Sequence, residues 1–286
     1  MLGAITGDTV GSVYEFHNTK DYWFELFQDR SSYTDDSIMT MAVAYWLLKD
    51  KEHSYQGLED IMVEFGHKYP CPMGGYGGGF RCWLFHPSAL HQYGVSPYDS
   101  KTGRHPYGSY GNGSAMRASA CGWFFDTLEE TERVAGISAA ITHNHPEGIK
   151  GAQATAATIF MARNGASKDE IKEYIEKTYG YNVHRTWEDI HREYYWHASC
   201  QETVPQALIA FLTSSNFEDA IRRAVSLGGD SDTLACITGG MAEAYYKEIP
   251  KAIVDRVMQP FPRIFNEILD DVRKETVYGD TCKIVE

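Results

Sequence analysis

The feature that most constrains the fold is a glycine-led acidic stretch followed by a long run of small and apolar residues. Residues 227–233 read Leu-Gly-Gly-Asp-Ser-Asp-Thr, and the run 234–246 follows directly. Ser, Asp and Thr favour the N-terminal cap of a helix, and glycines permit a tight turn before it. The pattern predicts a buried helix with two carboxylates at its N-terminus, where the helix dipole favours negative charge.

A second stretch of similar build lies near the other end of the chain. Residues 33–37 read Tyr-Thr-Asp-Asp-Ser and precede the apolar run 38–48. Either stretch alone is compatible with a plain helix cap. Two such caps, each leading into a buried helix, can meet in the fold and hold a divalent ion. Their hard oxygen atoms suit Mg²⁺, Mn²⁺ or Ca²⁺ rather than Zn²⁺.

The first residues indicate close packing between helices. Gly3, Gly7 and Gly11 recur at every fourth position, which places them on one face of a helix predicted over residues 1–16. Each glycine costs a helix about 1 kcal/mol relative to alanine, so the stripe predicts that another helix backbone approaches closely. Asp8 lies within this helix, where an acid is unexpected, and Glu15 lies near its end.

The rest of the chain is predicted to consist of helices joined by loops. No convincing alternation of apolar and polar residues indicates a strand, so the expected fold class is all-α, in one domain over residues 1–286. The other predicted helices cover 58–68, 129–141, 147–163, 168–178, 200–212 and 218–226, with a pair inside 250–277 and one that opens within 109–117 and runs to residue 125. Loops are expected over 17–32, 70–79, 91–108 and 186–195.

Composition limits the possible partners and compartments. The net charge of −13 argues against binding to a nucleic-acid backbone, which needs a basic face. Six scattered cysteines form no Cys-x-x-Cys pair, which indicates reduced thiols rather than a zinc knuckle or a disulfide framework. No basic leader and no apolar run of membrane-spanning length is present, so we expect a cytoplasmic protein without a membrane segment.

Two loops carry further candidate binding residues. Residues 108–117 read Gly-Ser-Tyr-Gly-Asn-Gly-Ser-Ala-Met-Arg, and glycines ahead of a helix N-terminus suit a phosphate. The loop is not a Walker A motif, because no Gly-Lys-Ser/Thr follows, and such a turn is often merely a turn. His143 and His145 are candidate metal ligands, although hydrogen bonding is the favoured interpretation of both.

These pieces together resemble the ADP-ribosylglycohydrolase family, which includes dinitrogenase reductase-activating glycohydrolases and ADP-ribosyl-acceptor hydrolases. The matching segments are 7–15, 33–37, 108–117, 142–143 and 228–233, in the order of the family. The resemblance implies a compact fold of orthogonal helices around a central cleft with two Mg²⁺ or Mn²⁺ ions. It also implies hydrolysis of the bond between C1″ of ADP-ribose and an acceptor, in a protein that we expect to be a monomer.

The resemblance also implies roles for individual residues. The implied metal ligands are Thr34, Asp35, Asp36, Asp230, Asp232 and Thr233. Glu15 matches a mobile catalytic acid. The implied substrate-binding residues are Gly108, Ser109, Tyr110, Gly111, Asn112, Gly113, Ser114, His143 and Gly148, with the diphosphate held by the 108–114 loop. Ser37 stands where many members have Thr, which keeps the hydroxyl.

Two other classes remain open at this point. Terpenoid synthases are also helical and bind Mg²⁺ through aspartates, but Met39 occupies the position where their third acid would lie. A catalytically silent member that binds ADP-ribose, or a structural relative, is the main alternative. Every implied ligand position and Glu15 hold chemically competent residues, which favours an enzyme. The acceptor (arginine, serine, O-acetyl-ADP-ribose, a nucleobase or another group on a protein or small conjugate) is not encoded in a readable motif.

Overall fold

Two helices from opposite ends of the chain form the centre of the molecule. The computed structural model describes residues 1–286, and in it α1 (Leu2–Gly11) lies along α13 (Ser231–Tyr246). A Cβ atom added to Gly7 would lie 1.8 Å from the carbonyl oxygen of Ala235, and one on Gly3 would lie 2.2 Å from that of Gly239. The predicted close approach of a second backbone is therefore confirmed, and it fixes α1 against the acidic cap of α13.

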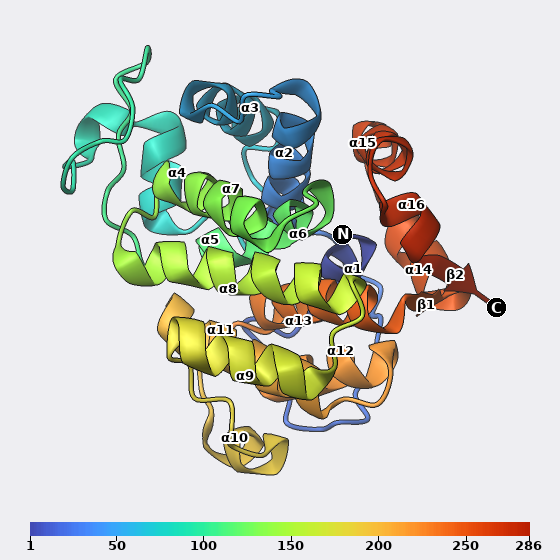
Figure 1. Cartoon of the computed structure of the whole chain (residues 1–286). Coiled ribbons are helices and arrows are strands. Elements are labelled where there is room, and N and C mark those ends of the chain that lie inside the picture. Colours follow the sequence, from blue (N-terminus) through green and yellow to red (C-terminus); the bar gives the residue numbers. More distant parts are fainter.

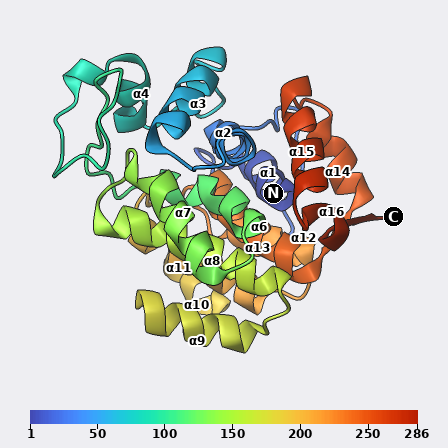
Figure 2. The same ribbon diagram turned by 45° about the horizontal axis from the view of Figure 1, so that its top comes forward.

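The other helices surround this pair. Helices α8, α11 and α12 pack on α13, while α2 packs on α3 and α15, and α7 covers α8 (Figures 1 and 2). The bounds are α2 Asp35–Lys49, α3 Tyr55–Lys68, α4 Gly78–Phe85, η1 Pro87–Ala89, α5 Gly113–Met116, η2 Arg117–Ala120, α6 Cys121–Phe124, α7 Leu128–Ala140, α8 Pro146–Arg163, α9 Lys168–Tyr179, α10 Trp187–Glu193, α11 Cys200–Thr213, α12 Phe217–Ser226, α14 Lys251–Met258, α15 Arg263–Glu275 and α16 Tyr278–Thr281.

Local capping explains where many of these helices begin. The Thr34 hydroxyl accepts a hydrogen bond from the Asp36 N–H at the start of α2. Pro146 occupies the first turn of α8, as predicted, and the His145 ring accepts from the Glu147 N–H as its cap. The favoured hydrogen-bonding role of His145 is thus confirmed. The predicted all-α fold class is confirmed by the helices that make up most of the structure.

Four local expectations were wrong. The first helix ends at Gly11 and not at residue 16, so Glu15 lies on irregular backbone. The predicted loop 186–195 contains α10, which Thr186 caps through a hydrogen bond from Asp189 N–H. The helix expected up to residue 125 is divided into α5, η2 and α6. Two short parallel strands, β1 (Glu248–Pro250) and β2 (Lys283–Val285), pair near the C-terminal end.

The remaining expectations concern cysteines and membranes. All six cysteines are free thiols, which agrees with the absence of a disulfide framework. None of the helices combines the length and the hydropathy that crossing a bilayer requires.

Candidate active site

A cavity of about 460 Å³ lies where the N-termini of α2 and α13 converge. Asp35 and Asp36 enter it from α2, and Asp230, Asp232 and Thr233 from the start of α13. Other parts of the lining come from the chain after α1, the glycine-rich run 74–79 and the loop before α5, together with single residues such as His143 and Trp196. The two acidic stretches that the sequence singled out therefore share one cavity.

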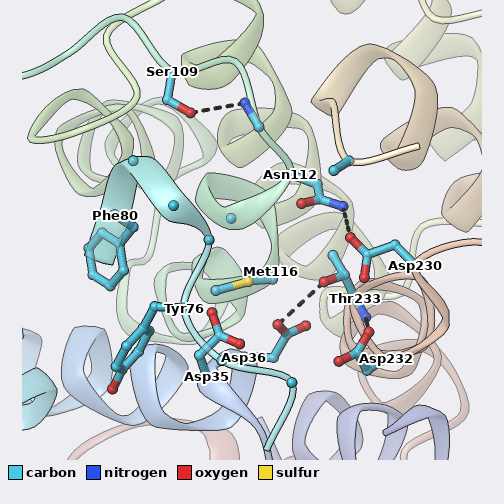
Figure 3. A pocket seen from close by; sticks show the side chains of 18 of the residues that line it. Asp35, Asp36, Tyr76, Phe80, Ser109, Asn112, Met116, Asp230, Asp232 and Thr233 are labelled. Carbon is cyan, nitrogen blue, oxygen red and sulfur yellow. Dashed lines mark hydrogen bonds between the residues drawn. The ribbon is translucent and has the colours of Figure 1, made fainter. Parts of the chain in front are cut away.

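Direct hydrogen bonds connect the two acidic caps with the loop before α5. The Thr233 hydroxyl donates to Asp36 Oδ1 at 3.3 Å, and Asn112 Nδ2 donates to Asp230 Oδ2 at 2.7 Å (Figure 3). Asn112 Nδ2 also lies 3.1 Å from the Thr203 hydroxyl on α11. Asn112, expected only beside a diphosphate, thus orients one of the expected metal ligands.

Asp8 forms the base of the α2 cap. Its carboxylate is fully buried and accepts from the backbone N–H groups of Thr34 and Ser37, each at 3.0 Å. Both side-chain hydroxyls donate to it as well, that of Thr34 at 2.7 Å. Burial raises the pKa of Asp8 to about 6, against the opposing effect of these hydrogen bonds. The acid that was unexpected within the first helix therefore holds the α2 N-terminus in place.

Glu15 reaches the acids of the α13 cap. One oxygen from each of Glu15, Asp230 and Asp232 lies within 4.8 Å of the others. Burial, followed by the negative charges of Asp230 and Asp8, raises the pKa of Glu15 to about 7. A carboxyl group with this pKa exchanges protons near neutral pH, which suits acid–base chemistry.

The acids in this cavity fit a divalent cation. Burial raises the pKa values of Asp35, Asp36 and Asp232 well above the ordinary range, and nearby carboxylates add to the effect. Asp36 Oδ2 is buried and has no hydrogen-bond partner. A cation would supply that partner and offset the repulsion between the carboxylates, and oxygen ligands of this kind suit Mg²⁺ or Mn²⁺.

Not every expected site residue lines the cavity. Thr34 is fully buried, with its hydroxyl turned toward Asp8. The buried Ser114 hydroxyl donates to the Gly148 carbonyl at 2.7 Å. Gly108 lies behind the loop, bonded to Asn144, and Tyr110 is about half exposed at the surface. The structure thus places these residues beside the cavity, and their roles stay predictions.

The loop before α5 offers fewer free amides than a simple phosphate nest. The N–H of Gly108 donates to Asn144 Oδ1, that of Gly111 to Ser109 Oγ and that of Asn112 to the Ala198 carbonyl. Gly113 begins α5 and lines the cavity together with Ser109 and Gly111. Any anion here must therefore use the remaining donors of the loop and of its neighbours.

His143 is one such neighbour. Burial, with a contribution from Arg117, lowers its pKa well below the ordinary value, so the ring is neutral. Its Nδ1 lies 2.7 Å from the Thr142 hydroxyl, which itself accepts from Arg117 Nη2 at 2.9 Å. These bonds are satisfied when Thr142 donates to Nδ1, which leaves a hydrogen on Nε2 beside Gly111 and Gly113. In this tautomer His143 offers a hydrogen-bond donor to the cavity.

The sequence indicated that the loop over 70–105 influences acceptor choice, but it named no residue of the glycine-rich run as a site residue. Residues 74–80 all line the cavity, with Tyr76 and Phe80 as the two aromatic members (Figure 3). A Cβ atom on Gly77 or Gly78 would meet no atom within 4 Å. The signal was present, because five glycines in this run leave a backbone surface that a ligand can approach closely. Phe16 and Trp196, both largely exposed, were missed as well.

The all-α fold and its cavity define a helical protein with a cluster of carboxylates that could hold a cation. Its sequence matches the model of the ADP-ribosylglycohydrolase family over residues 1–280. The chain belongs to this family, so it is an ADP-ribosyl glycohydrolase, and the predicted family and enzyme class are confirmed.

Similar proteins support this assignment over most of the chain. ADP-ribosylhydrolase ARH3 of Mus musculus is 25% identical, with 93% of this chain and 91% of the relative aligned. The human ARH3 is 26% identical over 86% and 84% of the two chains, and a putative ADP-ribosyl glycohydrolase of Acanthamoeba polyphaga mimivirus is 24% identical over 90% and 89%. A solved structure, titled ADP-ribosylglycohydrolase-related protein complex, superposes with a TM-score of 0.67 at 21% identity, covering 95% of this chain and 94% of that chain, which supports the fold.

Proposed function

We propose that this protein hydrolyses the bond between C1″ of ADP-ribose and an acceptor group, and that the reaction depends on two divalent cations, Mg²⁺ or Mn²⁺. The observation that carries the proposal is the close group of Glu15, Asp230 and Asp232 in a cavity shared with the α2 acids. Positive charge develops on the ribose ring when the glycosidic bond breaks. Carboxylates beside the ring therefore favour its cleavage.

The expected metal ligands in this proposal are Asp35, Asp36, Asp230, Asp232 and Thr233, with Thr34 at the edge of the set. When bound, the cations supply positive charge that orients the ribose hydroxyls in the cavity. Asn112 holds Asp230, and Asp8 holds the α2 cap, so the ligands are placed before a cation arrives. Because these ligands are already ordered, less free energy is lost in positioning them when a cation binds.

Glu15 is the proposed acid–base residue. A water molecule attacks C1″, the bond from C1″ to the acceptor breaks, and the proton from the water passes to the Glu15 carboxylate. The departing acceptor then receives a proton from the same carboxyl group. Burial favours the protonated form of Glu15 by raising its pKa above the ordinary value, which suits a group that both accepts and returns a proton.

The rest of the substrate has a matching surface. The diphosphate lies in this proposal beside the loop from Ser109 to Ser114, where Nε2 of His143 supplies a neutral hydrogen-bond donor. The bare backbone of the run 74–79 lets the ribose approach closely. The protein thus binds an anionic ligand through local donors in spite of its net charge of −13.

The printed names of the relatives describe hydrolases of ADP-ribosyl groups, and we extend that substrate class to this chain. The acceptor is an ADP-ribosylated protein side chain or a small ADP-ribosyl conjugate. A monomer in the cytoplasm that contacts neither a nucleic-acid backbone nor a membrane fits the proposal.

A panel of ADP-ribosyl conjugates tests the function. Conjugates of arginine, serine, O-acetyl groups and nucleobases are incubated with the protein in Mg²⁺, in Mn²⁺ or in EDTA, and free ADP-ribose is measured. We expect release from at least one conjugate in the presence of a cation and none in EDTA. ADP-ribose binding without release from any conjugate would instead support the silent-binder alternative.

A further inference from the structure

One side-chain amide joins the backbone of the proposed acid to the backbone of the α13 cap. Asn18 Oδ1 accepts from the Gly229 N–H at 2.8 Å, and its Nδ2 donates to the Gly229 carbonyl at 2.8 Å. The same Nδ2 lies 2.7 Å from the Tyr14 carbonyl and 2.9 Å from the Glu15 carbonyl. Gly229 directly precedes Asp230, so Asn18 links the two residues whose carboxylates meet in the cavity.

Local backbone hydrogen bonds hold only the first part of the turn next to Asn18, where the Gly228 N–H donates to the Val225 carbonyl at 3.0 Å. Gly228 and Gly229 both have positive φ, at 72° and 76°, and carry no side chain. Glycine samples this region freely, so contacts from outside must define the turn. Asn18 bonds both polar groups of Gly229, in the manner of a neighbouring strand, and its Cβ lies 3.5 Å from the position where Gly228 would carry one.

Lys20 anchors the same segment two residues later. Its ammonium group donates to the carbonyls of Leu227 at 2.6 Å, Tyr194 at 2.9 Å and His191 at 2.7 Å. Three donors thus meet three carbonyl oxygens, and no carboxylate takes part. The group therefore holds the segment after Glu15 against the start of the turn and against the chain that follows α10.

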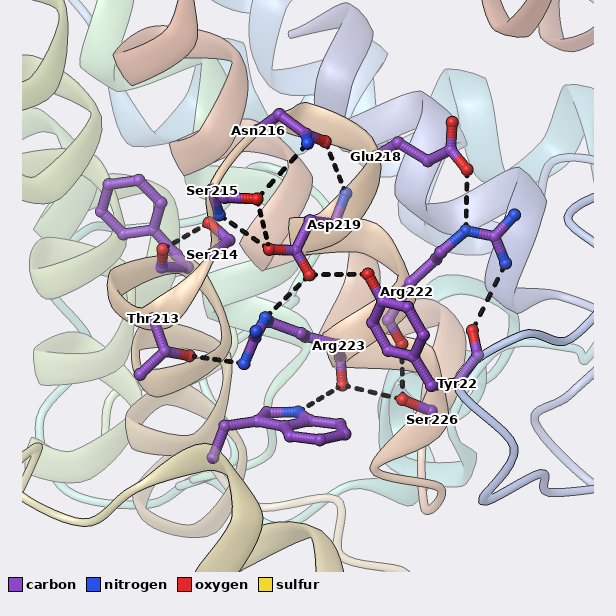
Figure 4. A network of polar contacts seen from close by, with 12 residues as sticks. Tyr22, Thr213, Ser214, Ser215, Asn216, Glu218, Asp219, Arg222, Arg223 and Ser226 are labelled. Carbon is purple, nitrogen blue, oxygen red and sulfur yellow. Dashed lines mark hydrogen bonds and ion pairs between the residues drawn. The ribbon is translucent and has the colours of Figure 1, made fainter.

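Further contacts secure the segment to α12. The Tyr22 hydroxyl donates to Asp219 Oδ1 at 2.8 Å (Figure 4). Arg222 Nη1 donates to the Phe24 carbonyl at 2.9 Å. These bonds involve neither Glu15 nor Gly229. Asn18 is consequently the member of the set that bonds to residues adjoining both Glu15 and Asp230.

We infer that Asn18 is a positioning residue, which sets the distance between the carboxylates of Glu15 and Asp230, with Lys20 as its support. The inference rests on the proposed function. Carboxylates within 4.8 Å of one another repel and separate unless their backbones are held. Without Asn18 the Glu15 segment and the glycine turn move independently, which misplaces the acid relative to C1″ and weakens cation binding.

Asn18→Ala and Asn18→Leu test this role, since alanine removes the amide and leucine replaces it with an apolar group of similar size. Mn²⁺ affinity is measured by titration calorimetry, and turnover of an ADP-ribosyl conjugate is resolved into kcat and KM. We expect kcat to fall by about tenfold to a hundredfold with KM nearly unchanged, because small misplacements of a catalytic group act on the rate. We expect the Mn²⁺ dissociation constant to rise by about fivefold or more.

Asn216→Ala is the matched control. The side-chain amide of Asn216 also bonds to the backbone. Its Oδ1 accepts a hydrogen bond from the Asp219 N–H at 2.9 Å and caps α12 (Figure 4). It does not line the cavity. We expect Asn216→Ala to lower the melting temperature while kcat and Mn²⁺ affinity stay at wild-type values.

These measurements distinguish a failure of the positioning role from a failure of the proposed function. If Asn18→Ala lowers only the melting temperature, as the control does, the positioning role is refuted. If wild-type protein releases no ADP-ribose from any conjugate, the proposed function fails, while the Mn²⁺ affinities still decide whether Asn18 shapes the cavity. If neither Asn18 variant folds, Lys20→Met tests the same segment, with unchanged kcat and Mn²⁺ affinity as the refuting result.

Discussion

The Thr233 hydroxyl donates a hydrogen bond to Asp36 across 3.3 Å, although 197 positions separate the two residues in the chain. This contact joins the caps of α2 and α13 inside the cavity. It brings the two acidic stretches into one oxygen-rich site, and it leaves the second Asp36 oxygen without a protein partner. The arrangement is costly without a cation, since buried carboxylates repel one another.

Asp36→Asn should separate stability from cation binding. In EDTA the variant is expected to melt at a higher temperature than wild type, because one of several repelling charges is gone. Wild type should gain about 2.7 kcal/mol from Mg²⁺ at about 100 times its dissociation constant, and the variant should gain far less. Thermal melts with and without Mg²⁺ measure both effects. Asp271→Asn, which changes a surface acid paired with Lys274, should leave the Mg²⁺ gain intact.

The stability of the metal-free protein should depend on pH in an unusual direction. The pKa of Glu15 rises from its ordinary value of 4.5 to about 7 in the folded protein, and burial shifts the neighbouring aspartates the same way. Between those two values the folded protein retains protons that the unfolded chain has lost, so the free energy of unfolding falls as pH rises. Melting temperatures in EDTA should therefore decrease from about pH 5 to pH 7.5. Saturating Mg²⁺ should reverse this slope, and parallel slopes would contradict a cation site among these acids.

Glu15→Gln should affect the rate alone. Glutamine keeps the shape of the side chain but cannot accept a proton, so turnover should fall on the order of 10²-fold or more. Affinities for Mg²⁺ and ADP-ribose should stay within a few-fold of wild type, as measured by calorimetry. Near wild-type turnover at saturating Mg²⁺ would transfer the acid–base role to an aspartate of the cavity.

Gly78→Val should weaken substrate binding without cost to the fold. A Cβ atom at Gly78 meets no atom within 4 Å, and valine is acceptable in the first turn of α4. The new side chain projects into the cavity, so ADP-ribose affinity should fall by about tenfold, which corresponds to about 1.4 kcal/mol. Gly78→Ala should show a smaller loss in the same calorimetric assay. Unchanged affinity in both variants would place the ribose away from this run.

Gly7→Ala should destabilise the whole molecule. The added carbon would lie 1.8 Å from the Ala235 carbonyl oxygen, so α1 and α13 must separate. Overpacking of this kind costs about 1–3 kcal/mol or more, and urea denaturation measures it. Gly240→Ala, within α13 itself, brings its carbon no closer than 3.2 Å to the Ser119 hydroxyl and serves as the matched control. Equal stability of the two variants would show that α1 adjusts easily.

Local sequence patterns were sufficient to predict those elements that depend on neighbouring residues. The cap of α2, the proline at the start of α8 and the glycine stripe of α1 follow from local hydrogen bonding and helical spacing, and the structure confirms them. Helix α13 also begins within the predicted acidic stretch, although its N-cap residue Asp230 makes no side-chain cap hydrogen bond. Local patterns did not predict the short helix α10, which lies in a region expected to be a loop. Helix α10 spans only seven residues, too few for a clear apolar period.

Tertiary structure alone decided how these elements combine into a site. Asp8 supports the α2 cap, Asn112 turns toward Asp230, and Asn18 bonds Gly229, in each case with a partner distant in the chain. No local pattern encodes such contacts, because they arise from the direction in which α1 and α13 cross and from the loops that this crossing brings together. The raised pKa values have the same origin, since burial and the approach of other carboxylates exist only in the folded protein.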